Sequence, residues 1–143
     1  MKPSKRKRPW LRRVVLLALV LAVYPAFVLT YTWSHVLQSP LPGGRHGPLD
    51  AYRHTLASAV VAYTLDARAI DLVNGVMERR GKRANAMDIH NNLIGAGIGS
   101  RAARFSDIEP MVARSVAAGQ IDAPSAGQTT WLAQDDWKEG FAW

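Results

Sequence analysis

The feature that most constrains this chain is an uncharged run of residues, 14–33, close to its start. A helix needs about 20 mainly apolar residues to cross a hydrocarbon core about 30 Å thick. Trp10 and Trp33 lie near the two ends of the run, where aromatic side chains are typical of membrane interfaces. The run is long for a signal-peptide core, and Pro25 interrupts the nearest small-residue cleavage pattern. We therefore expect an uncleaved transmembrane signal anchor over residues 14–37, with a cleaved signal peptide as the alternative.

The positive charge of the chain is concentrated before this run. The formal net charge is +7, and seven of the 18 lysines and arginines lie in residues 1–13. The other eleven equal the 11 acidic residues, so the rest of the chain is formally neutral. A basic tail beside a hydrophobic segment indicates contact with anionic lipid headgroups, and not with nucleic acid. The positive-inside rule predicts a single-pass protein of the inner (cytoplasmic) membrane, with a cytoplasmic N-terminus and an extracytoplasmic C-terminal domain.

The remainder of the chain divides into a linker, a helical region and an aromatic tail. Residues 38–48 contain three prolines and three glycines, which is typical of a turn-rich linker. Residues 49–119 have apolar side chains at helical spacing and no alternation of the kind that strands show. Residues 120–143 lose this period and carry aromatic side chains that either close the bundle or enter the membrane interface. The sequence predicts an all-α fold, a small bundle of three to four helices without a sheet, preceded by one N-terminal transmembrane helix.

Local signals set the expected helix boundaries. The first helix is expected to start near Pro48, and residues 65–80 either continue it or form a second helix. Asn85 is a suitable N-cap for the central helix, and Ser106 for the one after it.

Two of these helices begin with polar side chains on one face. Asp50 and His54 are i and i+4 neighbours in the first helix. In the central helix Asp88, Asn92 and Gly95 share one face. This stripe is not typical of a core, because glycine lets another backbone or a ligand come close. We expect Asp50, His54, Asp88 and Asn92 to converge, since buried polar groups need partners.

The order and spacing of these residues form a longer pattern, which comprises Asp50, Arg53, His54, Glu78, Asp88, Asn92 and Gly95. This pattern resembles the VanZ-like and YfiM-like membrane-associated helical proteins. It resembles still more closely an uncharacterised domain found at the tip of some polymorphic and wall-associated bacterial toxins. These groups are related to Wnt-type domains in a lipocone-type superfamily that acts on lipids or lipid-linked headgroups. The resemblance covers residues 47–99, and it departs from the VanZ-like families in having one membrane span instead of several.

The resemblance implies roles for particular residues. The catalytic set that it implies is Asp50, His54, Glu78, Asp88 and Asn92. Arg53, His90 and Asn91 match only the toxin-like branch. We predict substrate-phosphate binding by Arg53, Arg79 and Asn91, with Arg80 as an alternative to Arg79. We predict supporting roles for His90 and for Gly95, the latter in packing.

The residue types suit proton transfer and phosphate binding. His54 can act as a base or a nucleophile, because its pKa lies near neutrality and Asp50 can orient its ring. Arg53 can hold a phosphate through two N–H groups, and its position about 100° around the helix from His54 places it at the rim. We therefore expect a membrane-anchored envelope enzyme that hydrolyses or exchanges a phosphoester of a lipid-linked or phospholipid headgroup. A toxin-like effector domain is one setting for such an activity.

Two alternatives remain. The chain can be a non-catalytic envelope protein whose polar stripes fasten helices or bind a lipid or a protein partner. A divalent metal ion is the other alternative, with ligands from Asp50, His54, Asp88 and His90. We expect no cofactor otherwise, since the sequence has no cysteine, no HExxH motif, no phosphate loop and no dinucleotide-binding fingerprint.

The charge distribution makes a prediction about topology. A phosphatase reporter that works only outside the cytoplasm should be active when it is fused after Trp143, because the surplus positive charge precedes residue 14. A fluorescent reporter that matures only in the cytoplasm should stay dark at the same position. A bright fluorescent fusion with an inactive phosphatase fusion would reverse the orientation.

Overall fold

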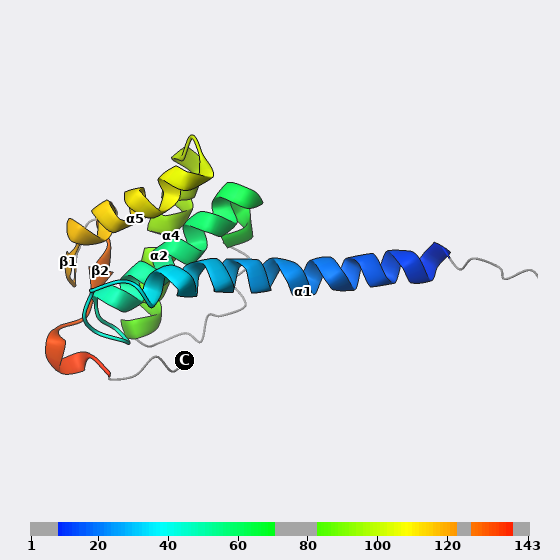
Figure 1. Ribbon diagram of the computed structural model, residues 1–143. Coiled ribbons are helices and arrows are strands. Elements are labelled where there is room, and N and C mark those ends of the chain that lie inside the picture. Colours follow the sequence, from blue (N-terminus) through cyan, green and yellow to red (C-terminus); the bar gives the residue numbers. More distant parts are fainter. Residues whose placement is uncertain (1–8, 71–82, 123–126, 139–143) are drawn as a thin grey trace, which may run out of the picture.

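The structure is a computed structural model that describes residues 9–70, 83–122 and 127–138. One long helix, α1, extends away from a bundle that contains α2, α4 and α5 (Figure 1). The described residues are mostly helical, as the sequence predicts.

Helix α1, Pro9–Val36, is the one described helix that is long and apolar enough to cross a membrane. The candidate span is Trp10–Val36, and an 18-residue window within it has a mean hydropathy of 2.4. Large apolar side chains in its first half are exposed, including Leu17 at 60 % and Val23 at 61 %. By length and composition, α1 is therefore compatible with the predicted anchor.

The second half of α1 packs against the bundle. Val28 and Val36 are buried in the main core, and the Tyr24 hydroxyl lies 2.7 Å from the Thr64 hydroxyl at the end of α2. Trp33 of α1 lies beside the first turns of α2, under the guanidinium of Arg53. Helices α1 and α2 therefore run in opposite directions along this contact.

Helix α2, Pro48–Thr64, starts as predicted, with Pro48 in the first turn, where a missing N–H costs nothing. It ends at Thr64, residues 65–67 form a turn, and residues 68–70 are helical again. Asp66 Oδ1 accepts a 2.8 Å hydrogen bond from the Arg68 amide at the start of this new segment. The break favours a second helix over a continuation of the first.

Helix α4, Arg83–Arg101, already includes the residues before Asn85, so the prediction that Asn85 is its N-cap is wrong. The helix runs parallel to α2, with Gly95 against the backbone of Thr55 and Gly99 against that of Ala59. A Cβ atom at either glycine would overlap a carbonyl oxygen of α2. The glycine face of α4 therefore packs against the backbone of another helix. This is one of the two alternatives that the sequence allowed, the other being close approach of a ligand.

The last part of the described chain covers one side of this helix pair. A 3₁₀ turn, η1 (Phe105–Asp107), leads into α5 (Ile108–Ala117), whose N-cap is Asp107. Ser106 is therefore not the cap that the sequence predicted.

Two strands and a second 3₁₀ turn complete the described chain. They are β1 (Gln120–Ile121), β2 (Thr130–Trp131) and η2 (Gln134–Asp136). The two strands pair in parallel, so the expectation of no sheet is wrong in this detail. Two-residue strands carry no periodic signal, because tertiary contacts decide their pairing.

The aromatic tail closes over the linker where the structure describes it. The Trp137 ring lies where a Cβ atom on Gly43 or Gly47 would contact it at 3.1 Å, and its Nε1 donates a hydrogen bond to Leu132 O at 2.7 Å. Trp131 packs against the main core. For Trp131 and Trp137, the structure therefore agrees with the alternative in which the aromatic tail closes the bundle.

The parallel α2–α4 contact makes a prediction about stability. Gly95→Ala should destabilise the fold by about 1–3 kcal/mol, because its Cβ meets backbone that cannot easily move. Gly97→Ala on the same helix should be stabilising by up to about 1 kcal/mol, because its Cβ meets only the flexible end of Arg101 and alanine favours the helix. Urea unfolding of the detergent-solubilised chain measures both. Equal stabilisation by the two substitutions would contradict the tight contact.

Candidate functional site

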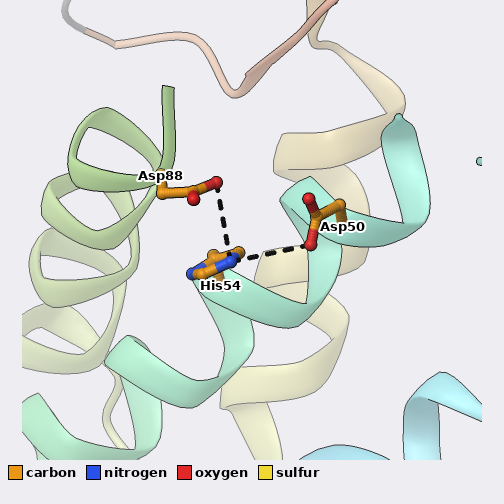
Figure 2. A group of neighbouring side chains, drawn as sticks. All are labelled: Asp50, His54 and Asp88. Atoms are coloured by element: carbon orange, nitrogen blue, oxygen red, sulfur yellow. Dashed lines mark ion pairs between the residues drawn. The ribbon is translucent and has the colours of Figure 1, made fainter. Parts of the chain in front are cut away.

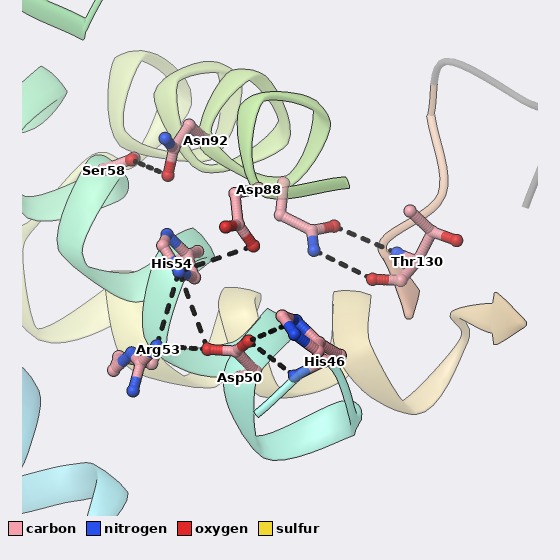
Figure 3. A network of polar contacts seen from close by, with 9 residues as sticks. His46, Asp50, Arg53, His54, Ser58, Asp88, Asn92 and Thr130 are labelled. Carbon is pink, nitrogen blue, oxygen red and sulfur yellow. Dashed lines mark hydrogen bonds and ion pairs between the residues drawn. The ribbon is translucent and has the colours of Figure 1, made fainter. Parts of the chain in front are cut away.

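Asp50 anchors a polar cluster at the first turn of α2. Its side chain is only 3 % exposed. One oxygen, Oδ2, accepts a 2.7 Å hydrogen bond from the His46 amide, and the other, Oδ1, accepts one from Arg53 (Figure 3). An acidic side chain in the first helical turn commonly accepts from the amides that precede the helix, so the His46 contact follows from the position of Asp50.

His54 lies one turn after Asp50 and faces α4. Its Nε2 is 3.6 Å from Asp50 Oδ1 and 3.5 Å from Asp88 Oδ1 (Figure 2). The parallel packing of α2 and α4 brings Asp88 to this position. The structure therefore places one imidazole nitrogen between two carboxylates from different helices.

Asp88 is the member of the cluster with the clearest electrostatic perturbation. Burial raises the pKa of its carboxyl above the ordinary value of 3.8, His54 opposes this, and the charge of Asp50 adds to it. Its Oδ1 is buried, and no described residue donates a hydrogen bond to it. Both observations show that the site disfavours the charged form of Asp88 more than water does.

Arg53 lies closer to the centre of the cluster than the sequence predicted. Its side chain is 12 % exposed, and its guanidinium lies 5.7 Å from the centroid of the Trp33 ring. The same Nη2 atom contacts Asp50 and lies 3.5 Å from His54 Nε2. The prediction that Arg53 lies at the rim of the site is therefore wrong, because Trp33 and Asp50 hold its guanidinium toward the centre.

Asn92 lies one turn beyond Asp88, on the face of α4 that meets α2. It is 9 % exposed, and its Oδ1 accepts a 2.9 Å hydrogen bond from Ser58 (Figure 3). The structure thus places Asn92 on the predicted face, where it binds Ser58 of α2. Gly95 lies in the helix contact and has the packing position that the sequence predicted.

Asn91 and His90 hold the C-terminal segment instead of facing the cluster. Asn91 is fully buried, and its amide exchanges two hydrogen bonds, of 2.8 and 3.0 Å, with the backbone of Thr130. His90 Nε2 lies 2.7 Å from Gln128 O. The phosphate-binding prediction for Asn91 is therefore wrong, because both of its polar atoms already bind protein backbone.

Three predicted site residues, Glu78, Arg79 and Arg80, lie outside the described residues.

His46 belongs to the site and was missed by the sequence reasoning. Its φ of 65° is unusual for a residue other than glycine. This conformation brings its Nδ1 to 3.8 Å from Asp50 Oδ2, where no described residue forms a hydrogen bond with it. His46 lies in a turn-rich linker, where the sequence has no periodic pattern that would assign it to a face. Its position just before α2 was the one available signal.

Three residues have the geometry to hold a metal ion. Asp50, His54 and Asp88 each offer one ligand atom, and these atoms lie within 4.8 Å of one another. His90 is not in the group, which removes one of the four predicted ligands. Arg53 contacts the same oxygen of Asp50 that lies nearest His54. A metal ion between these ligands would therefore require the guanidinium to move.

Comparison with known protein families, with curated proteins and with solved structures finds no match to this chain.

The raised pKa of Asp88 makes a prediction about stability. The folded state favours the protonated form of the Asp88 carboxyl. The contribution of this group to folding stability is therefore present at acid pH and is lost as the pH rises through the raised pKa. Asp88→Asn cannot ionise, so its melting temperature should rise relative to wild type as the pH rises from about 4 through the raised pKa of Asp88.

Asp107→Asn is the matched control. A hydrogen bond from Arg104 lowers the pKa of Asp107, so the stability that its charged form contributes is already complete above about pH 4. Above that pH, the melting temperature of this variant should therefore keep a constant offset from that of wild type. A parallel response of the two variants would contradict the assignment for Asp88.

Proposed function

We propose that this chain is a membrane-anchored envelope enzyme that hydrolyses or exchanges a phosphoester of a lipid-linked or phospholipid headgroup. The observation that carries the proposal is the position of His54 Nε2, between the carboxylates of Asp50 and Asp88. Histidine flanked by carboxylates is a common acid–base arrangement, because the carboxylates orient the ring and tune its proton affinity.

The two carboxylates are suited to different tasks. Asp50 is bound to Arg53 and to the His46 amide, so its charge is already balanced by partners. Asp88 has a raised pKa and an oxygen without a described donor. Two acids whose environments differ in this way can act as an orienting group and as a proton donor.

These roles give a balanced hydrolysis. His54 takes a proton from water as the water oxygen bonds to phosphorus. The bond from phosphorus to the leaving oxygen breaks, and Asp88 protonates that oxygen. His54 and Asp88 then carry opposite charges 3.5 Å apart, and direct proton transfer between them restores the starting state. Exchange follows the same course when an alcohol replaces water.

Arg53 supplies a fixed positive charge beside the reacting groups. Its Nη2 is 3.5 Å from His54 Nε2, and the Trp33 ring supports the guanidinium. A guanidinium has five N–H donors in one plane, which suits the oxygens of a phosphoryl group. Trp33 belongs to α1, so the candidate anchor is a structural part of the site.

A non-catalytic envelope protein is the second candidate, and a specific observation favours it. Asn91, Asn92 and Gly95 all fasten α4 to its neighbours. If the cluster of Asp50, His54 and Asp88 has the same purpose, its loss should lower stability and leave lipids unchanged.

The test compares His54→Gln with wild type in cells, by mass spectrometry of lipids and cell-wall precursors. Wild type should alter the amount of a phosphoester-containing lipid, and His54→Gln should reduce that change by about 100-fold or more. The melting temperature of the purified variant should stay close to that of wild type.

The matched control is His35→Gln, a histidine on α1 whose ring lies 4.7 Å from that of Tyr31 and not in the cluster. It should keep the full lipid change. Two results together would instead support the non-catalytic candidate. Wild type would cause no change in lipids, and His54→Gln would be less stable than wild type at equal expression.

A further inference from the structure

A groove between α4 and α5 lies outside the proposed catalytic cluster. Its volume is about 430 Å³, within the range of about 300–1,000 Å³ that is usual for small-molecule sites. The lining residues that the argument uses are Leu93, Gly97, Ile98, Arg101, Met111 and Arg114.

The groove combines an apolar wall with positive charge. Leu93, Ile98 and Met111 provide apolar surface, and Leu93 is 51 % exposed. Arg101 and Arg114 are both exposed side chains of the lining. None of the described lining residues is acidic. This chemistry is complementary to a molecule with an apolar chain and an anionic group.

Arginines in the last turn of a helix have a simpler explanation, which must be considered. Arg101 ends α4 and Arg114 lies in the last turn of α5, where a positive charge interacts favourably with the helix dipole. That explanation does not account for the groove or for the exposed Leu93. It also does not account for the Arg101 guanidinium lying over Gly97, whose missing side chain leaves the groove open.

The Arg101 end of the groove lies at the end of the bundle from which the exposed part of α1 departs. Gly99, two residues before the end of α4, packs against Tyr63 near the end of α2. The next residue of α2, Thr64, contacts Tyr24 of α1. Arg101 therefore lies on the side of the bundle where an anchored α1 would bring the bilayer.

We propose that this groove binds one anionic phospholipid of the surrounding membrane. An acyl chain packs along Leu93, Ile98 and Met111, and the phosphate lies between Arg101 and Arg114. The groove is separate from the cluster of Asp50, His54 and Asp88, so this proposal rests on the membrane anchoring of α1 but not on the proposed catalysis. Its role is to orient the bundle on the membrane.

Native mass spectrometry of the detergent-solubilised full chain, with phosphatidylglycerol or phosphatidylcholine as the probe, tests the proposal. Wild type should retain one phosphatidylglycerol and release phosphatidylcholine. The double variant Arg101→Glu/Arg114→Glu should bind phosphatidylglycerol about tenfold more weakly or worse, because both attractive charges are reversed.

Two further variants distinguish a groove from a general charge effect. Gly97→Phe puts a large side chain into the groove without changing charge, and its Cβ atom meets only the flexible end of Arg101. Binding should therefore be lost while the melting temperature is kept. Arg104→Glu changes an exposed arginine that does not line the groove, and binding should be kept. Retained binding by Gly97→Phe, or equal loss with Arg104→Glu, would overturn the proposal. Equal retention of the two lipids by wild type would also overturn it.

Discussion

The close parallel contact of α2 and α4 is the interaction on which the candidate site depends. Gly95 and Gly99 let the α4 backbone meet the carbonyl groups of Thr55 and Ala59. Two parallel helices in such close contact stay in register along their length. Residues of α4 that precede the glycines therefore also face residues of α2. Asp88 therefore meets His54, and Asn92 meets Ser58 one turn later. A side chain at Gly95 would separate the helices and move Asp88 away from His54.

The cluster that this contact creates has one more acid than its fixed base can balance. Asp50 and Asp88 are two carboxylates, whereas Arg53 supplies one permanent positive charge. The remaining charge is removed if a proton is held by Asp88 or His54. Burial raises the pKa of Asp88, so the site disfavours the charged form of this carboxyl and eases the surplus of negative charge. The same surplus of negative charge would attract a metal ion. However, Arg53 already contacts Asp50 Oδ1, the oxygen that would be the metal ligand.

Much of this arrangement was predictable because it is local or periodic. Asp50 and His54 share a face through helical spacing, and Asp88, Asn92 and Gly95 do so in α4. The meeting of the two faces was expected because buried polar groups need partners, and the glycines allowed another backbone or a ligand to come close. The placement of Arg53 was not predictable, because it depends on Trp33 in another helix.

The role of Asn91 was equally hidden, because its partner Thr130 lies 39 residues further along the chain. The left-handed conformation of His46 is set by contacts on both sides of the linker. Its amide donates to Asp50, and its carbonyl oxygen accepts from the amide of Leu132.

The packing of α1 constrains where the bilayer can lie. A span over residues 14–33 would place Tyr24 about 15 Å deep, and with it the bundle edge at Thr64. The exposed Arg101 and Arg104 near that edge disfavour such depth, because charged side chains in hydrocarbon are costly. A span from Pro9 to Phe27 is about 28 Å long and lets Arg12 and Arg13 reach back to the headgroups. It brings only the bundle edge at Thr64, beside Tyr24, to within about 5 Å of the hydrocarbon boundary and leaves the rest of the bundle outside. Trp33 and the adjacent Arg53 then lie about 9 Å beyond the hydrocarbon edge, a height that suits the phosphate of a lipid-linked substrate with an extended headgroup.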